Sequence, residues 1–241
     1  MTWRQVIPTT FTLMAMLAGV SSILIAREGQ FELAAQLIML AMLLDGLDGN
    51  LARMLKGATE FGGELDTYVD LTAFGLAPAI LFYSIALQGH QMWRVLVTAA
   101  IVLSGVIRLA RFKVVDPERG QKGYTGLPIT ANAAWVAMLV YLSERGLFGE
   151  SAIAEGPFAA IFLGGVLLFI ALQISNYRYP KPTKYVVTFL PCVVLVLMFA
   201  FGGPRLAIPA AFITIALGLG YILLGPAVGR RLSAARRGSV D

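Results

Sequence analysis

The sequence carries little charge. Among its 241 residues only 14% are Asp, Glu, Lys or Arg, whereas 58% are hydrophobic. A soluble domain carries about 25% charged residues, so this composition argues against a soluble enzyme. Apolar runs of around 20 residues, the length that an α-helix needs to cross a bilayer, recur along the chain. We therefore predict an all-α integral membrane protein.

Cysteine and histidine are scarce as well, with one of each in the chain. The single cysteine, Cys192, excludes a disulfide bond within the chain, and its apolar surroundings predict a role as a buried packing residue. The single histidine, His90, is predicted at the membrane face opposite the acidic residues described below. An imidazole base is therefore not expected to act beside them.

The sequence also lacks a polar linker long enough to join two domains, and it contains no internal repeat. A single domain over residues 1–241 is therefore predicted. The first apolar run is not followed by a small-residue cleavage site at the distance typical of a signal peptide, so we expect it to be retained as a span.

About eight transmembrane helices are predicted from the apolar runs. Short segments rich in charged residues, Gly and Pro separate them, for example at residues 27–30 and 116–120. The runs begin near Phe11, Phe31, Gly62, Gln91, Leu127, Phe158, Tyr185 and Leu206.

Positive charge is concentrated on one side of this predicted bundle. With eight spans both termini share a side, and that side receives fifteen of the nineteen Lys and Arg residues. Cytoplasmic loops are enriched in these residues, so we expect a multi-pass protein of the cell membrane with its termini in the cytoplasm. The basic residues are spread over several loops, and we therefore expect no nucleic-acid partner.

One acidic motif interrupts the apolar background. Residues 45–70 read D-x2-D-G-x2-A-R-x8-G-x3-D-x3-D, with Asp45 and Asp48 on one predicted helix and Asp66 and Asp70 on the next. Each carboxylate at bilayer depth costs about 2.5–3.5 kcal/mol on the insertion scale. A bound cation offsets this cost, so the motif predicts a metal site at the cytoplasmic side.

Helical periodicity brings the four carboxylates together. At about 100° per residue, each pair of aspartates shares one face of its helix, and the short connection near residues 56–61 makes the two helices antiparallel neighbours. Hard divalent ions such as Mg²⁺ take carboxylate oxygens and leave positions open for substrate phosphates. Two such ions can clamp a diphosphate. By contrast, Glu64 lies off the acidic face and is predicted to be a solvated rim residue.

Small residues share the acidic faces. Gly49, Ala52 and Gly62 leave space there for a large ligand, although small residues also serve ordinary helix packing in lipid. Arg53 is placed to meet a ligand phosphate or to pair with an aspartate; its side chain would also reach the membrane interface.

The motif resembles that of the CDP-alcohol phosphatidyltransferases, with every defining position matched. The resemblance implies a six-helix membrane core over about residues 1–180, usually homodimeric, followed here by a helical extension over about residues 181–241. It also implies transfer of a phosphatidyl group from a CDP-linked lipid to an alcohol, with release of CMP. Two divalent ions, Mg²⁺ or Mn²⁺, would be held by Asp45, Asp48, Asp66 and Asp70.

The same resemblance implies roles for single residues. Asp70 would also act as the base toward the incoming hydroxyl. The CDP pocket would be lined by Thr12, Gly49, Ala52, Arg53 and Gly62.

Within the family, the chain is similar to membrane-embedded phosphatidylserine synthases. The similarity includes Phe61 to Asp66, Phe74 to Ala79, Arg108 to Phe112 and Gly126 to Pro128. It implies CDP-diacylglycerol and L-serine as substrates and phosphatidylserine as the product. Thr9, Ala15 and Ala73 depart from the usual residues of that subfamily, so the acceptor stays open.

A second group of cations follows the fourth predicted helix. Arg108 and Arg111 are three residues apart on one side of it and are predicted to hold an anion, either the lipid phosphate or the carboxylate of an amino-acid acceptor. Lys122, in a Gly-rich loop, is a further candidate. Anchoring at the cytoplasmic interface is the alternative for all three.

Two other functions remain open at this point. One keeps the metals and the CDP-lipid but uses another alcohol, such as inositol phosphate or glycerol phosphate, or an ether-linked lipid. The other is a metal or proton transporter, since intramembrane carboxylates also occur there. Transporters often contain inverted repeats and broken spans near the midplane, and this chain shows its acids once, near one face.

Overall fold

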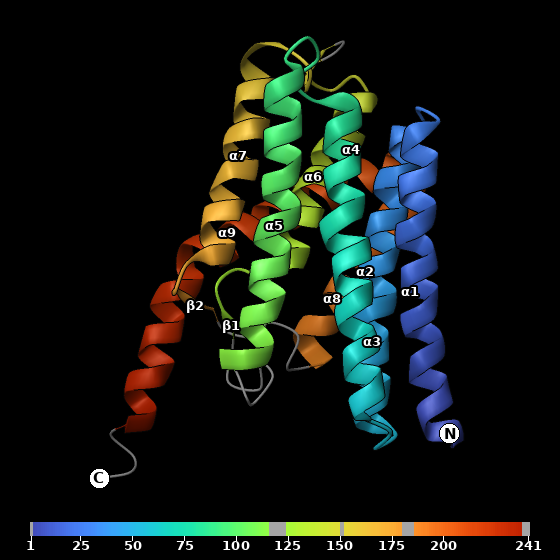
Figure 1. The fold of residues 1–241 in the computed structure, drawn as a ribbon, viewed down its shortest axis with the longest axis vertical. Coiled ribbons are helices and arrows are strands. Elements are labelled where there is room, and N and C mark those ends of the chain that lie inside the picture. The colour runs from blue at the N-terminus through green and yellow to red at the C-terminus, as the bar shows by residue number, and fades with distance from the viewer. Residues whose placement is uncertain (1, 116–123, 150–151, 180–185, 238–241) are drawn as a thin grey trace.

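The computed structural model describes residues 2–115, 124–149, 152–179 and 186–237 as a bundle of long helices (Figure 1). Five helices of the first part run in chain order as α1 Trp3–Arg27, α2 Phe31–Met54, α3 Glu60–Asp70, α4 Ala77–Ile85 and α5 Gln91–Val115. A π-helical turn, η1 Leu71–Leu76, joins α3 directly to α4. The second part contains α6 Ile129–Glu144, α7 Gly156–Ile174, α8 Val186–Phe201 and α9 Gly203–Arg237. Two short strands, β1 Tyr124–Thr125 and β2 Arg178–Tyr179, pair antiparallel.

The helices confirm the predicted all-α membrane fold. Because α3, η1 and α4 form one continuous segment, the described residues contain eight helical segments, each near a predicted apolar run. Five of them are long and apolar enough to cross a membrane. The other three fall outside these limits: α2 carries the charged motif, and α6 and α8 have 16 residues each.

The first helix begins at Trp3, eight residues before the predicted start near Phe11. Its N-terminus has a capping box, in which Thr2 and Gln5 satisfy backbone and side-chain groups reciprocally. Pro8 lies inside the helix and cannot donate to the carbonyl of Arg4. Gly57, between α2 and α3, packs so closely on that carbonyl that a Cβ at this position would overlap its oxygen. The close approach ties the α2–α3 connection to α1.

The C-terminal helices pack on the rest of the bundle through two aromatic contacts. The rings of Phe199 in α8 and Tyr141 in α6 lie 4.8 Å apart, and Gln36 of α2 donates to the Phe199 carbonyl at 3.2 Å. Tyr221 of α9 contacts Tyr179 of β2 with ring centroids 5.4 Å apart. Burial raises the pKa of the Tyr179 hydroxyl.

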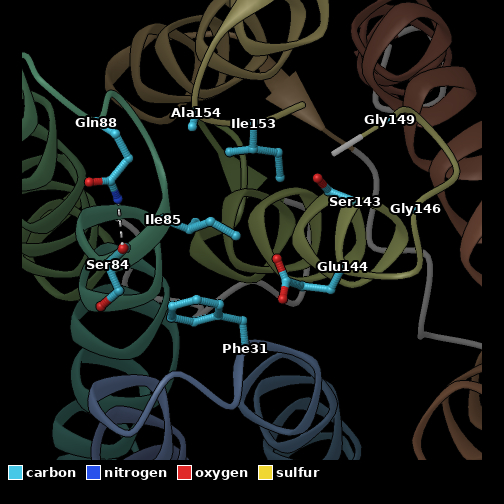
Figure 2. A pocket seen from close by; sticks show the side chains of 10 residues that line it. All are labelled: Phe31, Ser84, Ile85, Gln88, Ser143, Glu144, Gly146, Gly149, Ile153 and Ala154. Atoms are coloured by element: carbon cyan, nitrogen blue, oxygen red, sulfur yellow. Dashed lines mark hydrogen bonds between the residues drawn. The ribbon is translucent and has the colours of Figure 1, made fainter. Parts of the chain in front are cut away.

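A cavity of about 370 Å³ opens where the α1–α2, α4–α5 and α6–α7 connections meet (Figure 2). Phe31, Ile85 and Ile153 supply its apolar wall, and Glu144 and the Ser84–Gln88 pair supply polar groups, with Gln88 donating to the Ser84 carbonyl at 3.0 Å. None of the site residues predicted from the sequence lines it. These connections lie at the opposite end of the bundle from the α2–α3 connection (Figure 1).

Candidate metal centre

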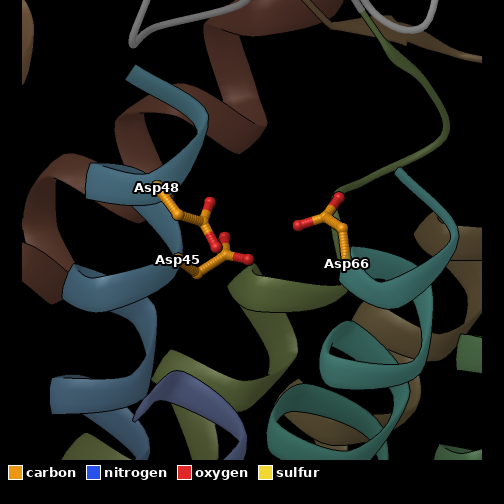
Figure 3. A group of neighbouring side chains, drawn as sticks. All are labelled: Asp45, Asp48 and Asp66. Atoms are coloured by element: carbon orange, nitrogen blue, oxygen red, sulfur yellow. The ribbon is translucent and has the colours of Figure 1, made fainter. Parts of the chain in front are cut away.

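Three aspartates from two helices form a compact cluster. Asp45 and Asp48 project from α2 and Asp66 from α3, and one carboxylate oxygen of each lies within 4.8 Å of the others (Figure 3). Asp45 and Asp48 are one helical turn apart, so both reach the same side of α2. The structure thus brings together three of the four carboxylates predicted to converge.

The α2–α3 connection sets the two acidic faces opposite each other. Lys56 adopts a left-handed conformation with φ of 51°, which ends α2 and reverses the chain within a few residues. Thr59 then caps α3 by accepting a hydrogen bond from the backbone N–H of Gly62 at 3.0 Å. Gly62 therefore lies in the first turn of α3, one turn before Asp66.

Asp48 is the most enclosed member of the cluster. Its side chain is only 5% exposed, and within the described part of the chain its Oδ2 atom accepts no hydrogen bond. Thr12 of α1 is also buried; its hydroxyl donates to the Pro8 carbonyl at 3.1 Å and interacts with the Asp48 carboxylate. A buried carboxylate oxygen without a partner is costly, and a metal ion beside it removes that cost. The residues present therefore fit a divalent cation.

Asp70 lies one turn beyond Asp66 and outside the group of three carboxylates that share the 4.8 Å limit. It is half-buried and interacts electrostatically with Asp66 and with Asp45. Arg108 of α5, which is 6% exposed, also interacts with Asp70 and lies 5.3 Å from the Phe112 ring centroid. The arrangement places one acid and one buried cation at the edge of the cluster.

The small residues and Arg53 lie beside the aspartates of α2. Arg53 is exposed, donates to the Asn50 side chain at 2.9 Å and interacts electrostatically with Asp48. A Cβ at Gly49 would meet only an Arg53 nitrogen, at 3.8 Å, so the surface near Gly49 is open. Ala52 is half-buried in the same helix. Their predicted roles in binding CDP stay predictions, but their positions match them.

Arg111 has different neighbours from those predicted. Its two terminal nitrogens donate to the carbonyls of Ile174 at 2.7 Å and Ser175 at 2.6 Å, and further to Gln173, Asn176 and Thr125. These groups belong to the end of α7, to the two residues that follow it and to β1. Carbonyls at a helix C-terminus lack intrahelical partners, and Arg111 supplies donors to them. Its predicted role as an anion ligand gains no support from these contacts.

These contacts predict that Arg111→Ala destabilises the protein without changing its metal dependence. Hydrogen bonds to a charged group contribute about 1.5–3 kcal/mol each and are not additive, so we expect a loss of roughly that size in the free energy of unfolding. A thermal unfolding series in detergent measures it. An unchanged midpoint, combined with a higher serine KM, would instead support the anion-binding role.

The remaining predicted residues have simple outcomes. Lys122 lies outside the described residues. Glu64 is half-exposed, as expected for a rim residue, and it also forms an ion pair with Lys113 of α5 at 2.5 Å. His90 is exposed in the α4–α5 connection, away from the aspartates. The expectation of a buried Cys192 is wrong: the side chain is exposed on α8, on which Leu190 and Val194 are exposed as well.

Sequence reasoning did not identify three features of this region. The proximity of Asp70 and Arg108 joins residues that are distant in sequence and on separate helices. The Glu64–Lys113 ion pair does so as well. The π-helical turn after Asp70 leaves no signal in the pattern of apolar residues, because it lies inside a continuous apolar span.

A profile of the CDP-alcohol phosphatidyltransferase family matches residues 5–177. The chain belongs to this family. The match runs from α1 to just beyond the end of α7 and includes every candidate site residue, whereas β2, α8 and α9 follow it.

Relatives of this phosphatidyltransferase carry informative names. A CDP-diacylglycerol–serine O-phosphatidyltransferase of Helicobacter pylori strain J99 is 36% identical over 194 residues, which cover 80% of this chain and 78% of the relative. An enzyme of the same name from Mycobacterium tuberculosis is 30% identical, covering 85% of this chain and 73% of its own length. An archaetidylserine synthase of Methanothermobacter thermautotrophicus is 35% identical over 73% of this chain and 70% of the relative.

Proposed function

We propose that this phosphatidyltransferase transfers the phosphatidyl group of CDP-diacylglycerol to the hydroxyl of L-serine, which yields phosphatidylserine and CMP. Family membership and the names of the relatives support this reaction. The carboxylate cluster between α2 and α3 is the observation that carries it. The names of both the diacylglycerol-type relative and the archaetidyl-type relative include serine.

We propose that Asp45, Asp48, Asp66 and Asp70 together hold two divalent ions, Mg²⁺ or Mn²⁺. When bound, such ions neutralise the charge of the diphosphate and of the departing phosphate oxygen. The CDP moiety would be received by Thr12, Ala52, Arg53 and Gly62 and by the open surface at Gly49. Thr12 and Arg53 both interact with Asp48, which supports this assignment.

The transfer step forms a bond between the serine hydroxyl oxygen and the phosphorus that bears diacylglycerol. The bond from that phosphorus to the bridging oxygen breaks, and CMP leaves with the electron pair. Asp70 accepts the hydroxyl proton, since it stands at the edge of the cluster where an acceptor can approach. Phosphoryl transfer needs positioning and charge neutralisation more than covalent help, and a carboxylate within hydrogen-bond reach suffices as the base.

We assign Arg108 a role in anion binding: its guanidinium would hold either the lipid phosphate or the serine carboxylate. A buried guanidinium that interacts with Asp70 would lie close to the reacting atoms, and it offers forked donors to either anion. Arg111 is left out of this assignment because its donors serve backbone carbonyls.

We further propose that the site and both termini face the cytoplasm and that the protein is a homodimer of single-domain chains in the cell membrane. The excess of Lys and Arg on the side of the aspartates supports the orientation. The family resemblance supports the dimer.

An ether-linked CDP-lipid is the second candidate donor, favoured by the similarity to an archaetidylserine synthase. The test incubates purified protein with Mn²⁺ or Mg²⁺, diacyl or ether CDP-lipid, and serine, inositol phosphate or glycerol phosphate. Mass spectrometry of the lipid product identifies donor and acceptor together.

We expect serine-dependent CMP release that stops when EDTA is added and returns with excess Mn²⁺. The activity needs the metal because the clustered carboxylates repel one another and the diphosphate without it. Brisk CMP release with another alcohol but none with serine would contradict the proposed acceptor. Release that persists in EDTA would contradict the metal site.

A further inference from the structure

A π-helical turn begins immediately after the proposed base. Leu71–Leu76 forms this turn, and Asp70 is the helical residue immediately before it. The turn is part of one continuous span of residues 60–85, so it is not a break between two helices. Single π turns inside α-helices are rare and frequently occur at functional sites.

The turn changes the direction of the aspartates relative to the rest of their span. A π turn accommodates about one more residue than an α turn, which rotates the segments on either side by about 100° relative to each other. Asp66 and Asp70 precede the turn and face the cluster, while Ala77 and Leu81 follow it and are buried in the core. The turn therefore decides which way the aspartates point when the core is packed.

One face of the turn is fixed by a backbone contact with α1. A Cβ at Gly19 would lie 2.7 Å from the Ala73 Cα and 2.8 Å from its Cβ, closer than real Cβ contacts. Gly19 is buried and Ala73 is 0% exposed, so neither can move toward solvent. Only glycine allows α1 to approach this turn so closely.

The opposite side of the turn is packed less rigidly. A Cβ at Gly105 of α5 would lie 2.7 Å from the Cδ1 atom of Ile129, and one at Gly75 would lie 3.6 Å from the same atom. This neighbour is the terminal carbon of a buried side chain, which yields more readily than the backbone atom that a Cβ at Gly19 would meet. The closest contact of an added Cβ is therefore 2.7 Å on both sides. At Gly19 the atom met is backbone, whereas at Gly105 it is the end of a side chain.

We propose that Gly19 is a positioning residue for Asp70: its contact with Ala73 holds the π turn and thereby aims Asp70 at the reacting groups. This inference rests on the proposed function, since Asp70 is placed there as base and metal ligand. General helix packing in lipid is the competing account of a buried glycine. That account predicts lower stability and no change in metal dependence.

The test compares Gly19→Ala with Gly105→Ala in purified full-length protein. Three quantities are measured: serine-dependent kcat, the Mn²⁺ concentration at half-maximal activity, and Mn²⁺ binding without substrate by electron paramagnetic resonance. We expect Gly19→Ala to lower kcat by about tenfold or more, since misplacements of about 1 Å can cost 10²-fold. Mn²⁺ half-saturation should rise about threefold or more by both readouts. Gly105→Ala should stay within about twofold of wild type.

Wild-type kcat and Mn²⁺ affinity in Gly19→Ala would overturn the proposal. So would a loss of activity with unchanged Mn²⁺ affinity, or equal losses in Gly105→Ala. If Gly19→Ala does not fold, Ala73→Gly replaces it, because it loosens the same contact without adding an atom. It should shift Mn²⁺ half-saturation in the same direction, and an unchanged value would contradict the inference. Wild-type protein that neither binds Mn²⁺ nor forms phosphatidylserine would instead refute the proposed function.

Discussion

Asp70→Asn is expected to lower serine-dependent turnover by about 10²–10⁴-fold, the contribution of a positioned general base. The amide keeps the size of the side chain but cannot accept the hydroxyl proton. Binding of the CDP-lipid should be largely spared, because Asp70 lies outside the group of Asp45, Asp48 and Asp66 that is gathered within 4.8 Å. Single-turnover product formation and equilibrium CDP-lipid binding, measured at saturating Mn²⁺, separate the two effects.

Glu64→Gln is the matched control for this substitution. It makes the same carboxylate-to-amide change on the same helix, at a half-exposed residue that pairs with Lys113. Turnover of Glu64→Gln should stay within about twofold of wild type, since surface ion pairs contribute little. If Asp70→Asn retained wild-type turnover at limiting Mn²⁺, Asp70 would be neither base nor metal ligand.

Asp48→Asn should act on binding more than on the chemical step. Asp48 is 5% exposed, and its Oδ2 atom has no hydrogen-bond partner among the described residues, so a metal ion is the fitting neighbour for it. Loss of outer-shell partners alone costs about 10–100-fold in metal affinity, and loss of a direct ligand should cost at least as much. We expect the affinity for CDP-lipid in Mn²⁺ to fall by about tenfold or more.

The metal dependence of that loss is its control. In EDTA, wild type and Asp48→Asn should bind CDP-lipid with similar, weak affinity, because the interaction that the substitution removes is then absent from both. A difference that persists at full size in EDTA would mean that Asp48 contacts the nucleotide directly. Wild-type affinity of the variant at low Mn²⁺ would exclude Asp48 as a ligand.

The helices were predictable because each needs an apolar run long enough to cross the bilayer, and such runs are visible in the sequence. The start of α1 was not, because Trp3 to Pro8 mixes polar residues with a proline and its helical conformation depends on the cap at Thr2. The aspartate faces followed from the 3.6-residue period. Asp45, Asp48 and Asp66 do meet in space, as that period requires.

The features that sequence could not supply depend on contacts between distant elements. Arg111 and Arg108 are equivalent by spacing, yet Arg108 reaches Asp70 and Arg111 reaches the end of α7. The two arginines have different partners because of the way in which α5 crosses the neighbouring helices. The π turn depends in the same way on Gly19 and Ala73, which are 54 positions apart in the sequence. Periodicity within one helix carries no information about such pairs.

The proposed transfer requires divalent ions held between the aspartates of α2 and α3. Anomalous diffraction from crystals grown with Mn²⁺ and CDP-diacylglycerol locates such ions. We expect two manganese peaks between Asp45, Asp48, Asp66 and Asp70. Carboxylates pointing apart, with no anomalous peak among them while the CDP-lipid is bound, would contradict this requirement.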